Sequence, residues 1–168
     1  NRNMMFQVKD RSDRELVLAP EYTAVVQRLA NTTFKQKSNL RLFYVAECFR
    51  GENTQFGRYR QFTQLGVEIL NPTIDQTAYL YTLAKTLIAF FYTGLTVREY
   101  QKATESISLN KGVTRGLDYY IDPSTKLPIG KGFEISCELL GTAAQICGGG
   151  TYEGGQGFAL GIDRLLLI

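Results

Sequence analysis

The chain of 168 residues contains no histidine and no tryptophan. The lack of histidine excludes a Ser-His-Asp triad, a Cys-His dyad and any zinc site with histidine ligands made from this chain alone. Cysteine is also scarce, because only Cys48, Cys137 and Cys147 occur, and no two of them form a C-x-x-C pair. This odd number of widely spaced cysteines favours reduced thiols in the core, and it predicts a cytoplasmic protein.

Long hydrophobic runs are equally rare. The first residues show no apolar segment typical of a signal peptide. The one long apolar stretch, residues 78–95, is interrupted by Lys85 and by several threonines and tyrosines, so it predicts a buried helix and not a membrane span. A net charge of +3 permits a polyanionic partner without requiring one. No RNA-recognition motif or basic stripe supports a plain RNA-binding module.

Residues 41–70 form the stretch around which the rest of the chain is organised. The chain is 44% hydrophobic, so it has enough apolar side chains for a core, and its length predicts one domain. Residues 42–49 and 60–70 have the character of strands, and the connector 50–59 contains turn-forming glycine and asparagine. The pattern predicts an antiparallel hairpin with a long loop.

The second strand of this hairpin has two different faces, since a strand sends alternate side chains to opposite sides. Leu65 and Ile69 belong to an apolar face that predicts core packing. Phe62, Gln64 and Glu68 share the other face, and a ring, an amide and a carboxylate are an unusual set to bury for packing alone. We expect a functional site on that face.

Three arginines, Arg50, Arg58 and Arg60, flank the hairpin loop. Guanidinium groups bind phosphate in a bidentate manner, and an adjacent aromatic ring can stack on a base. On composition alone, the simpler interpretation is an ordinary solvated hairpin with a basic tip.

Shorter patterns predict the remaining elements. The first elements in chain order are a hairpin of residues 5–8 and 15–18 and a helix that begins at Ala19–Glu21. A second helix is capped by Thr73 or Asp75 and stopped by Gly94. A connector over 98–111, a strand over 133–139, and a final strand that enters a helix presenting Arg164 complete the chain. The apolar stripe of the second helix, from Leu80 to Phe91, is assigned to core packing.

Several strings in the sequence resemble one family. FRGENTQFGRYRQFTQLGVEI, from residue 49, resembles motif 2 of class II aminoacyl-tRNA synthetases in its histidyl-tRNA synthetase form, where an F-R-x-E loop runs into G-R-Y-R-Q-F-x-Q-x-G-x-E. RGLDYY, residues 115–120, is similar to a signature of that family. GFALGIDRLL, from residue 157, resembles class II motif 3, G-x-x-x-G-x-[DE]-R.

Two further segments match with departures. CGGGTY, from residue 147, is similar to the family's G-G-x-Y-D-G loop, but Thr151 and Glu153 replace an arginine and the aspartate. Glycines in such a loop would let the backbone approach a ligand closely. APEYT, from residue 19, is similar to the family's R-P-E-G-T, with Ala19 in place of the arginine. Without the resemblance, Glu21 would be interpreted simply as an acid at a helix start.

The resemblance implies an α+β fold with a mostly antiparallel sheet flanked by helices, as in class II catalytic domains. It implies that residues 1–168 are a single, partial catalytic domain that lacks motif 1, a long insertion and the anticodon-binding domain. A junction near Asn110 or Lys111 would fit this expectation. In the family motif 1 builds the dimer interface, so the complete protein is expected to be a homodimer.

The implied reaction is attack of the histidine carboxylate on the α-phosphorus of ATP, with Mg²⁺ as a cofactor. The products are histidyl-adenylate and pyrophosphate, and the histidyl group then passes to tRNA(His). The alternative is the regulatory subunit of ATP phosphoribosyltransferase, a catalytically inactive relative that senses histidine. Residues 61–64 are compatible with both, but a pure regulator has no need of the ATP-binding arginines or of Arg115.

The resemblance also implies a role for individual residues, in two groups. On the nucleotide side, Arg50 would hold the α-phosphate, and Arg58 would bind the β- and γ-phosphates with support from Arg60. Phe62 and Arg164 would sandwich the adenine. Glu52 would contact the adenine amino group or Mg²⁺. On the amino-acid side, Glu21, Thr23 and Gln64 would hold the ammonium and backbone, Glu68 and Tyr120 would read the imidazole, and Tyr119 and Tyr152 would lie close by. Arg115 would be the catalytic cation, alongside Arg50.

Overall fold

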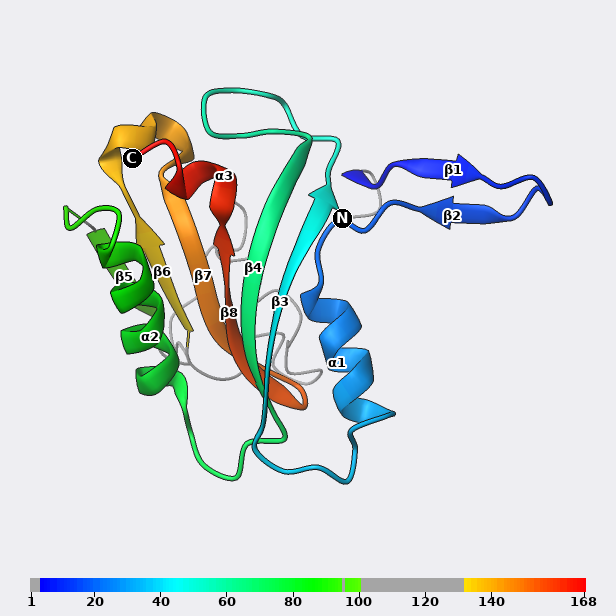
Figure 1. Ribbon diagram of the computed structural model, residues 1–168, viewed down its shortest axis with the longest axis horizontal. Coiled ribbons are helices and arrows are strands. Elements are labelled where there is room, and N and C mark those ends of the chain that lie inside the picture. Colours follow the sequence, from blue (N-terminus) through cyan, green and yellow to red (C-terminus); the bar gives the residue numbers. More distant parts are fainter. Residues whose placement is uncertain (1–3, 95, 101–131) are drawn as a thin grey trace.

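A six-stranded antiparallel sheet with the strand order β3-β4-β8-β7-β6-β5 organises the fold (Figure 1). The computed structural model describes residues 4–94, 96–100 and 132–168. In chain order, the elements are β1 (Gln7–Lys9), β2 (Glu15–Val17), α1 (Thr23–Asn31), β3 (Leu40–Phe49), β4 (Gln61–Leu70), α2 (Thr77–Ala89), β5 (Thr96–Tyr100), β6 (Gly132–Ser136), the 3₁₀ segment η2 (Glu138–Ala143), β7 (Gln145–Tyr152), β8 (Gly155–Gly161) and α3 (Ile162–Leu165). The predicted α+β class is confirmed.

The predicted hairpin is present as β3 and β4, which pair from Leu40 opposite Leu70 to Phe49 opposite Gln61. The two faces of β4 also separate as predicted. Ile69 belongs to the main core cluster and is 2% exposed. The opposite face carries Phe62, Gln64 and Glu68, and all three line a cavity. Alternation along this strand therefore predicted correctly which of its side chains share the cavity face.

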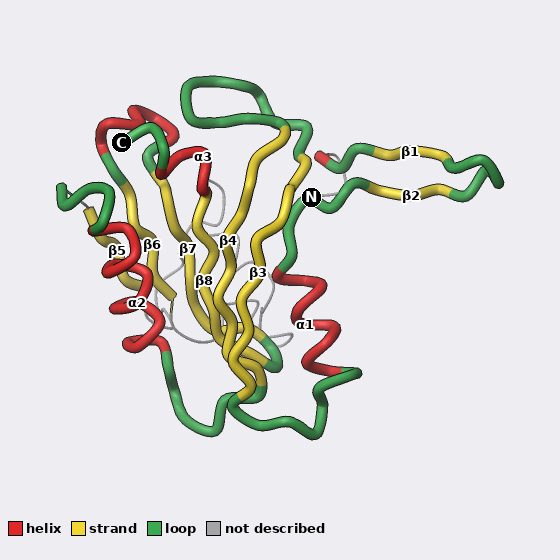
Figure 2. The backbone as a smooth tube through the Cα atoms, viewed as in Figure 1, coloured by secondary structure: helices red, strands yellow, loops and turns green. Residues whose placement is uncertain are grey.

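Two helices pack against opposite faces of the sheet, and Figure 2 shows α2 near its β5 edge and α1 near its β3 edge. On one face, Leu80, Ala84 and Ile88 of α2 pack into the main core with residues of β4, β6, β7 and β8. On the other face, Val26 and Ala30 of α1 pack against Leu70 near the β3 edge. Because α1 is short and lies at that edge, the central strands of its face are left for the cavity.

The helix boundaries differ from the sequence prediction. Helix α1 begins at Thr23, with Tyr22 as the N-cap residue, so Pro20 and Glu21 lie before the helix and not in its first turn. Helix α2 ends at Ala89, five residues before the predicted stop at Gly94. Phe91, placed in the apolar stripe, lies beyond this helix and is 53% exposed.

Three strand assignments also change. Residues 98–100, predicted as the start of a connector, belong to the edge strand β5, while residues 101–111 lie outside the described residues. The predicted strand over 133–139 ends at Ser136 and continues as η2. The glycines 148–150, expected in a loop, belong to strand β7 in the middle of the sheet.

The β1–β2 hairpin projects away from the main sheet (Figure 1).

The predicted buried thiols are confirmed, since Cys48, Cys137 and Cys147 are all free and buried. Among the described residues, no helix has both the length and the apolar character that a membrane crossing requires.

Candidate active site

The floor of the cavity consists of small residues on adjacent strands. Directly paired residues of a sheet share a face, and the register places Gly157 of β8 opposite both Glu68 and Gly150, and Ala159 opposite Gly148. All five residues line a cavity of about 590 Å³. This volume is in the range of small-molecule sites in proteins. The glycine-rich strings thus hollow the sheet face instead of forming a loop.

Only glycine fits at position 157, because the side chain of Glu68 lies directly beside it. A Cβ atom at this position would lie only 1.7 Å from Oε2 of Glu68 and 2.6 Å from the carbonyl oxygen of Val67. A methyl group cannot fit beside that carboxylate, so glycine on β8 is the condition for burying Glu68 on β4.

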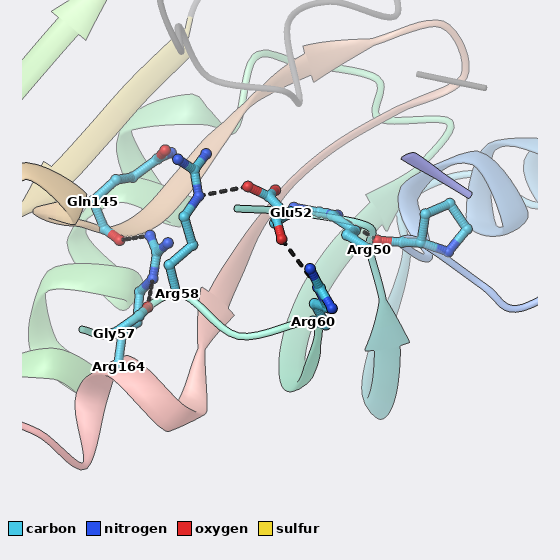
Figure 3. A network of polar contacts seen from close by, with 8 residues as sticks. Arg50, Glu52, Gly57, Arg58, Arg60, Gln145 and Arg164 are labelled. Carbon is cyan, nitrogen blue, oxygen red and sulfur yellow. Dashed lines mark hydrogen bonds and ion pairs between the residues drawn. The ribbon is translucent and has the colours of Figure 1, made fainter. Parts of the chain in front are cut away.

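One end of the cavity is cationic (Figure 3). The Nε of Arg50 donates to the carbonyl oxygen of Pro20 at 2.6 Å, and its guanidinium lies 4.8 Å from the centre of the Phe62 ring. The Nε of Arg58 is 2.5 Å from Oε2 of Glu52, which is buried. These arginines are therefore held by protein groups, and their positions are fixed before any phosphate binds.

Arg164 joins this end from the short helix α3. Its Nε donates to the carbonyl oxygen of Gly57 at 2.6 Å, and a second nitrogen donates to that of Gln145 at 2.5 Å (Figure 3). Gly57 has φ +69°, a conformation that favours glycine. The arginine thereby ties the β3–β4 loop to the start of β7. Phe62 and Arg164 both line the cavity, and their sandwich of an adenine ring stays a prediction.

Arg60 and Glu52 both connect to the cationic end through neighbouring groups. Arg60 does not line the cavity, and its Nε donates to the backbone carbonyl oxygen of Glu52 at 3.2 Å. The Glu52 carboxylate faces the Arg58 cation, so as a Mg²⁺ ligand it would first have to leave that partner. Within residues 4–94, 96–100 and 132–168, no group of three or more acidic or cysteine side chains could hold a metal ion.

The other end of the cavity is acidic. Glu21, Thr23, Gln64, Glu68 and Tyr152 all line it. Glu68 is 1% exposed, and the hydroxyl of Tyr152 donates to its Oε2 at 2.8 Å. Burial raises the pKa of Glu68 to about 8; the Tyr152 hydrogen bond opposes this shift, and the charge of Glu21 adds to it. In the protein without ligand, Glu68 is therefore protonated at neutral pH.

This raised pKa predicts how stability depends on pH. Between pH 4.5 and about 8 the folded protein binds more protons at Glu68 than the unfolded chain does. The free energy of unfolding should therefore fall, by an amount on the order of a few kcal/mol, as the pH rises through this range. Urea midpoints of ligand-free protein measured across the range should show the decline, and Glu68→Gln should remove it.

The control for this experiment is Glu47→Gln, which changes an exposed glutamate on β3. That variant should keep the slope of the parent protein. A parent protein with a flat profile between pH 4.5 and 8 would contradict the buried, protonated state of Glu68.

The structure adds residues that the sequence reasoning missed. Glu134 and Ser136 line the cavity from β6, and Asp163 lines it from α3. Alternation with the buried Phe133 and Ile135 would have placed Glu134 on the functional face. Asp163 occupies the [DE] position of the string that resembles motif 3, but the sequence analysis assigned a role only to the arginine that follows it. Arg115, Tyr119 and Tyr120 lie outside the described residues, so their roles stay predictions.

Comparisons with known proteins identify a family and a fold. A family model described as Histidyl-tRNA synthetase matches residues 1–90. A curated histidine–tRNA ligase from Clostridioides difficile (strain 630) is 28% identical over 97% of this chain and 59% of its own length. The chain thus spans less than two thirds of the length of that relative.

Solved structures show the same fold. The chain aligns with an apo histidyl-tRNA synthetase from S. aureus with a TM-score of 0.66 and 22% identity, over 97% of this chain and 60% of that one. It also aligns with a Bacillus halodurans protein described as an ATP phosphoribosyltransferase regulatory subunit/histidyl-tRNA synthetase, with a TM-score of 0.67 and 17% identity, over 97% of this chain and 67% of that one. The architecture is that of class II aminoacyl-tRNA synthetases.

Proposed function

Because the chain belongs to the histidyl-tRNA synthetase family, we propose that it is the catalytic part of a histidine–tRNA ligase. The observation that carries this proposal is one cavity that brings guanidinium and carboxyl groups together. Arg50, Arg58 and Arg164 line it, and so do Glu21 and Glu68. Guanidinium groups suit the phosphates of a nucleotide, and carboxyl groups suit an amino acid that carries an ammonium and an imidazole group.

The proposed reaction is attack of the histidine carboxylate on the α-phosphorus of ATP. It forms histidyl-adenylate and releases pyrophosphate, and the histidyl group then passes to tRNA. No protein nucleophile is needed, because the reaction depends on positioning and on neutralising charge. Arg50 would face the α-phosphate and Arg58 the outer phosphates, with Arg60 supporting them from behind Glu52. Mg²⁺ would arrive with the phosphates of ATP.

For the amino acid, Glu21, Thr23 and Gln64 would hold the ammonium and backbone, and Glu68 with Tyr152 would face the imidazole. By resemblance, Arg115, Tyr119 and Tyr120 would complete the site. The same resemblance suggests a homodimer, a tRNA(His) partner and a cytoplasmic location for the whole protein. It also suggests that the chain corresponds to a partial catalytic domain.

The rival function is a histidine-sensing regulatory subunit without catalysis. A regulatory subunit would bind histidine through the same residues as the ligase. The arginines that would bind ATP therefore distinguish the two functions. Arg50, Arg58 and Arg164 are each held in place at the cavity, and three guanidinium groups at one cavity suit phosphate binding, which favours the ligase.

The test is ATP–pyrophosphate exchange by the full-length protein, measured with each of the twenty amino acids in turn. The ligase should show exchange that histidine stimulates far more than the others do. A protein that binds histidine tightly but shows no exchange would establish the regulatory function instead.

Phe62→Ala tests the nucleotide end separately. Stacking of a base on an aromatic ring contributes roughly 1–3 kcal/mol. The variant should therefore raise the dissociation constant for ATP by about ten-fold or more, as measured by calorimetry, because 1.4 kcal/mol corresponds to one decade.

The matched control is Phe43→Ala, which removes a 77% exposed ring of the same hairpin that does not line the cavity. It should leave ATP affinity unchanged. If Phe62 served only packing, its loss would lower the melting temperature while the ATP affinity of the folded fraction stayed that of the parent.

A further inference from the structure

Asp163 joins two parts of the chain that lie 100 residues apart. Its Oδ2 accepts a hydrogen bond of 2.5 Å from the backbone N–H of Thr63. Asp163 lies in the first turn of α3, and it lines the cavity. An acid in the first turn of a helix is common because it suits the helix dipole. That explanation does not account for a partner on another strand.

The sheet register shows why this partner exists. The β4–β8 pairing ends where Gln64 lies opposite Gly161, the last residue of β8. Beyond this point the chain turns into α3, so Thr63 has no residue of β8 opposite it. A buried backbone N–H left without an acceptor costs free energy. The Asp163 carboxylate supplies the acceptor and extends the pairing of β4 by one residue.

The position of Thr63 gives this bond a functional consequence. Thr63 lies between Phe62 and Gln64, and both of these side chains face the cavity. Phe62 belongs to the proposed nucleotide end and Gln64 to the proposed amino-acid end. The backbone held by Asp163 is therefore the segment from which both substrates are contacted.

Arg164, the next residue of α3, also fixes segments that border the cavity. Arg164 binds the carbonyl oxygens of Gly57 and Gln145, so consecutive residues of one short helix hold the loop before β4, the first residues of β4 and the start of β7. We propose that Asp163 is a positioning residue, which fixes the Phe62–Gln64 segment for binding of ATP and histidine together. This proposal rests on the function proposed above.

The test compares Asp163→Ala with Asp163→Asn in the full-length protein. Dissociation constants for ATP and for histidine are measured separately by calorimetry and corrected for the folded fraction. Asp163→Ala should weaken both by about five- to ten-fold, because the loss of the hydrogen bond acts on each ligand only through the position of the Phe62–Gln64 segment and leaves the ligands' own contacts in place. Asp163→Asn should restore both to within about two-fold, since an amide oxygen accepts the same bond.

The control is Asp75→Ala, which removes a carboxylate that accepts from the backbone N–H of Thr77 at 2.9 Å and from Nε2 of Gln156 at 3.3 Å, all three residues being away from the cavity lining. It should lower the melting temperature without changing either affinity. The same result for Asp163→Ala would overturn the proposal, and so would an Asn variant as weak as the Ala variant. A parent protein that binds ATP but no histidine would refute the proposed ligase, and the ATP measurements would still decide whether Asp163 positions Phe62.

Discussion

Replacing Arg50 by alanine should lower histidine-dependent ATP–pyrophosphate exchange by about 10²–10³-fold, the usual cost of losing one preorganised donor at a developing charge. The guanidinium lies over the Phe62 ring, and its Nε is held by Pro20, so its position does not depend on the substrate. Such a cation stabilises the transition state more than the ground state. Histidine affinity, measured by calorimetry, should change far less.

Two further variants sharpen this prediction. Arg50→Lys should recover only part of the rate, because an ammonium group does not reproduce the planar fork of a guanidinium. Arg41→Ala removes the other arginine of this hairpin that lies over a ring, 5.1 Å from the centre of Tyr79. Arg41 does not line the cavity, so its loss should leave exchange unchanged. An Arg50→Ala protein with exchange near that of the parent would remove Arg50 from the reaction.

The second large effect is expected at Glu68. In the empty site this carboxyl has a pKa of about 8, whereas the imidazole of free histidine has a pKa near 6.5. Between these values a protonated Glu68 meets a neutral imidazole, and one proton is shared in the complex. Below this window a proton must be released on binding, and above it one must be taken up. Histidine affinity should therefore be highest between about pH 6.5 and 8.

Glu68→Gln should weaken histidine binding at neutral pH by about one to two decades, because a hydrogen bond to a charged group contributes roughly 1.5–3 kcal/mol. It should also abolish the decline in affinity above pH 8, since the amide does not titrate. ATP affinity is the internal control and should stay close to that of the parent. Calorimetry that shows the same histidine affinity for both proteins at every pH would exclude Glu68 from the pocket.

Local sequence patterns were sufficient to predict the central part of the molecule. Alternation along residues 60–70 separated the core face with Ile69 from the cavity face with Glu68, because the side chains of a strand alternate whatever it packs against. The nucleotide site expected around Arg58 came from the resemblance of that string to motif 2, and it stays a prediction. In both cases the information lies within a few residues.

The same patterns failed where the outcome depended on distant partners. Local signals placed the start of α1 at Ala19–Glu21, but the helix begins at Thr23. Glycines 148–150 suggested a loop, but they form a strand because β6 and β8 pair with both of its edges. Propensity is a weak guide wherever neighbouring strands supply the hydrogen bonds.

By itself, the sequence determined the fold class, the hairpin and the residue types that face the cavity. Only the tertiary structure decided how those residues are paired. The bonds from Tyr152 to Glu68, from Thr63 to Asp163 and from Arg164 to Gly57 join residues 84, 100 and 107 positions apart. Each depends on the order and register of β4, β7 and β8, which no short stretch of sequence specifies. The raised pKa of Glu68 has the same origin, because burial by the whole sheet produces it.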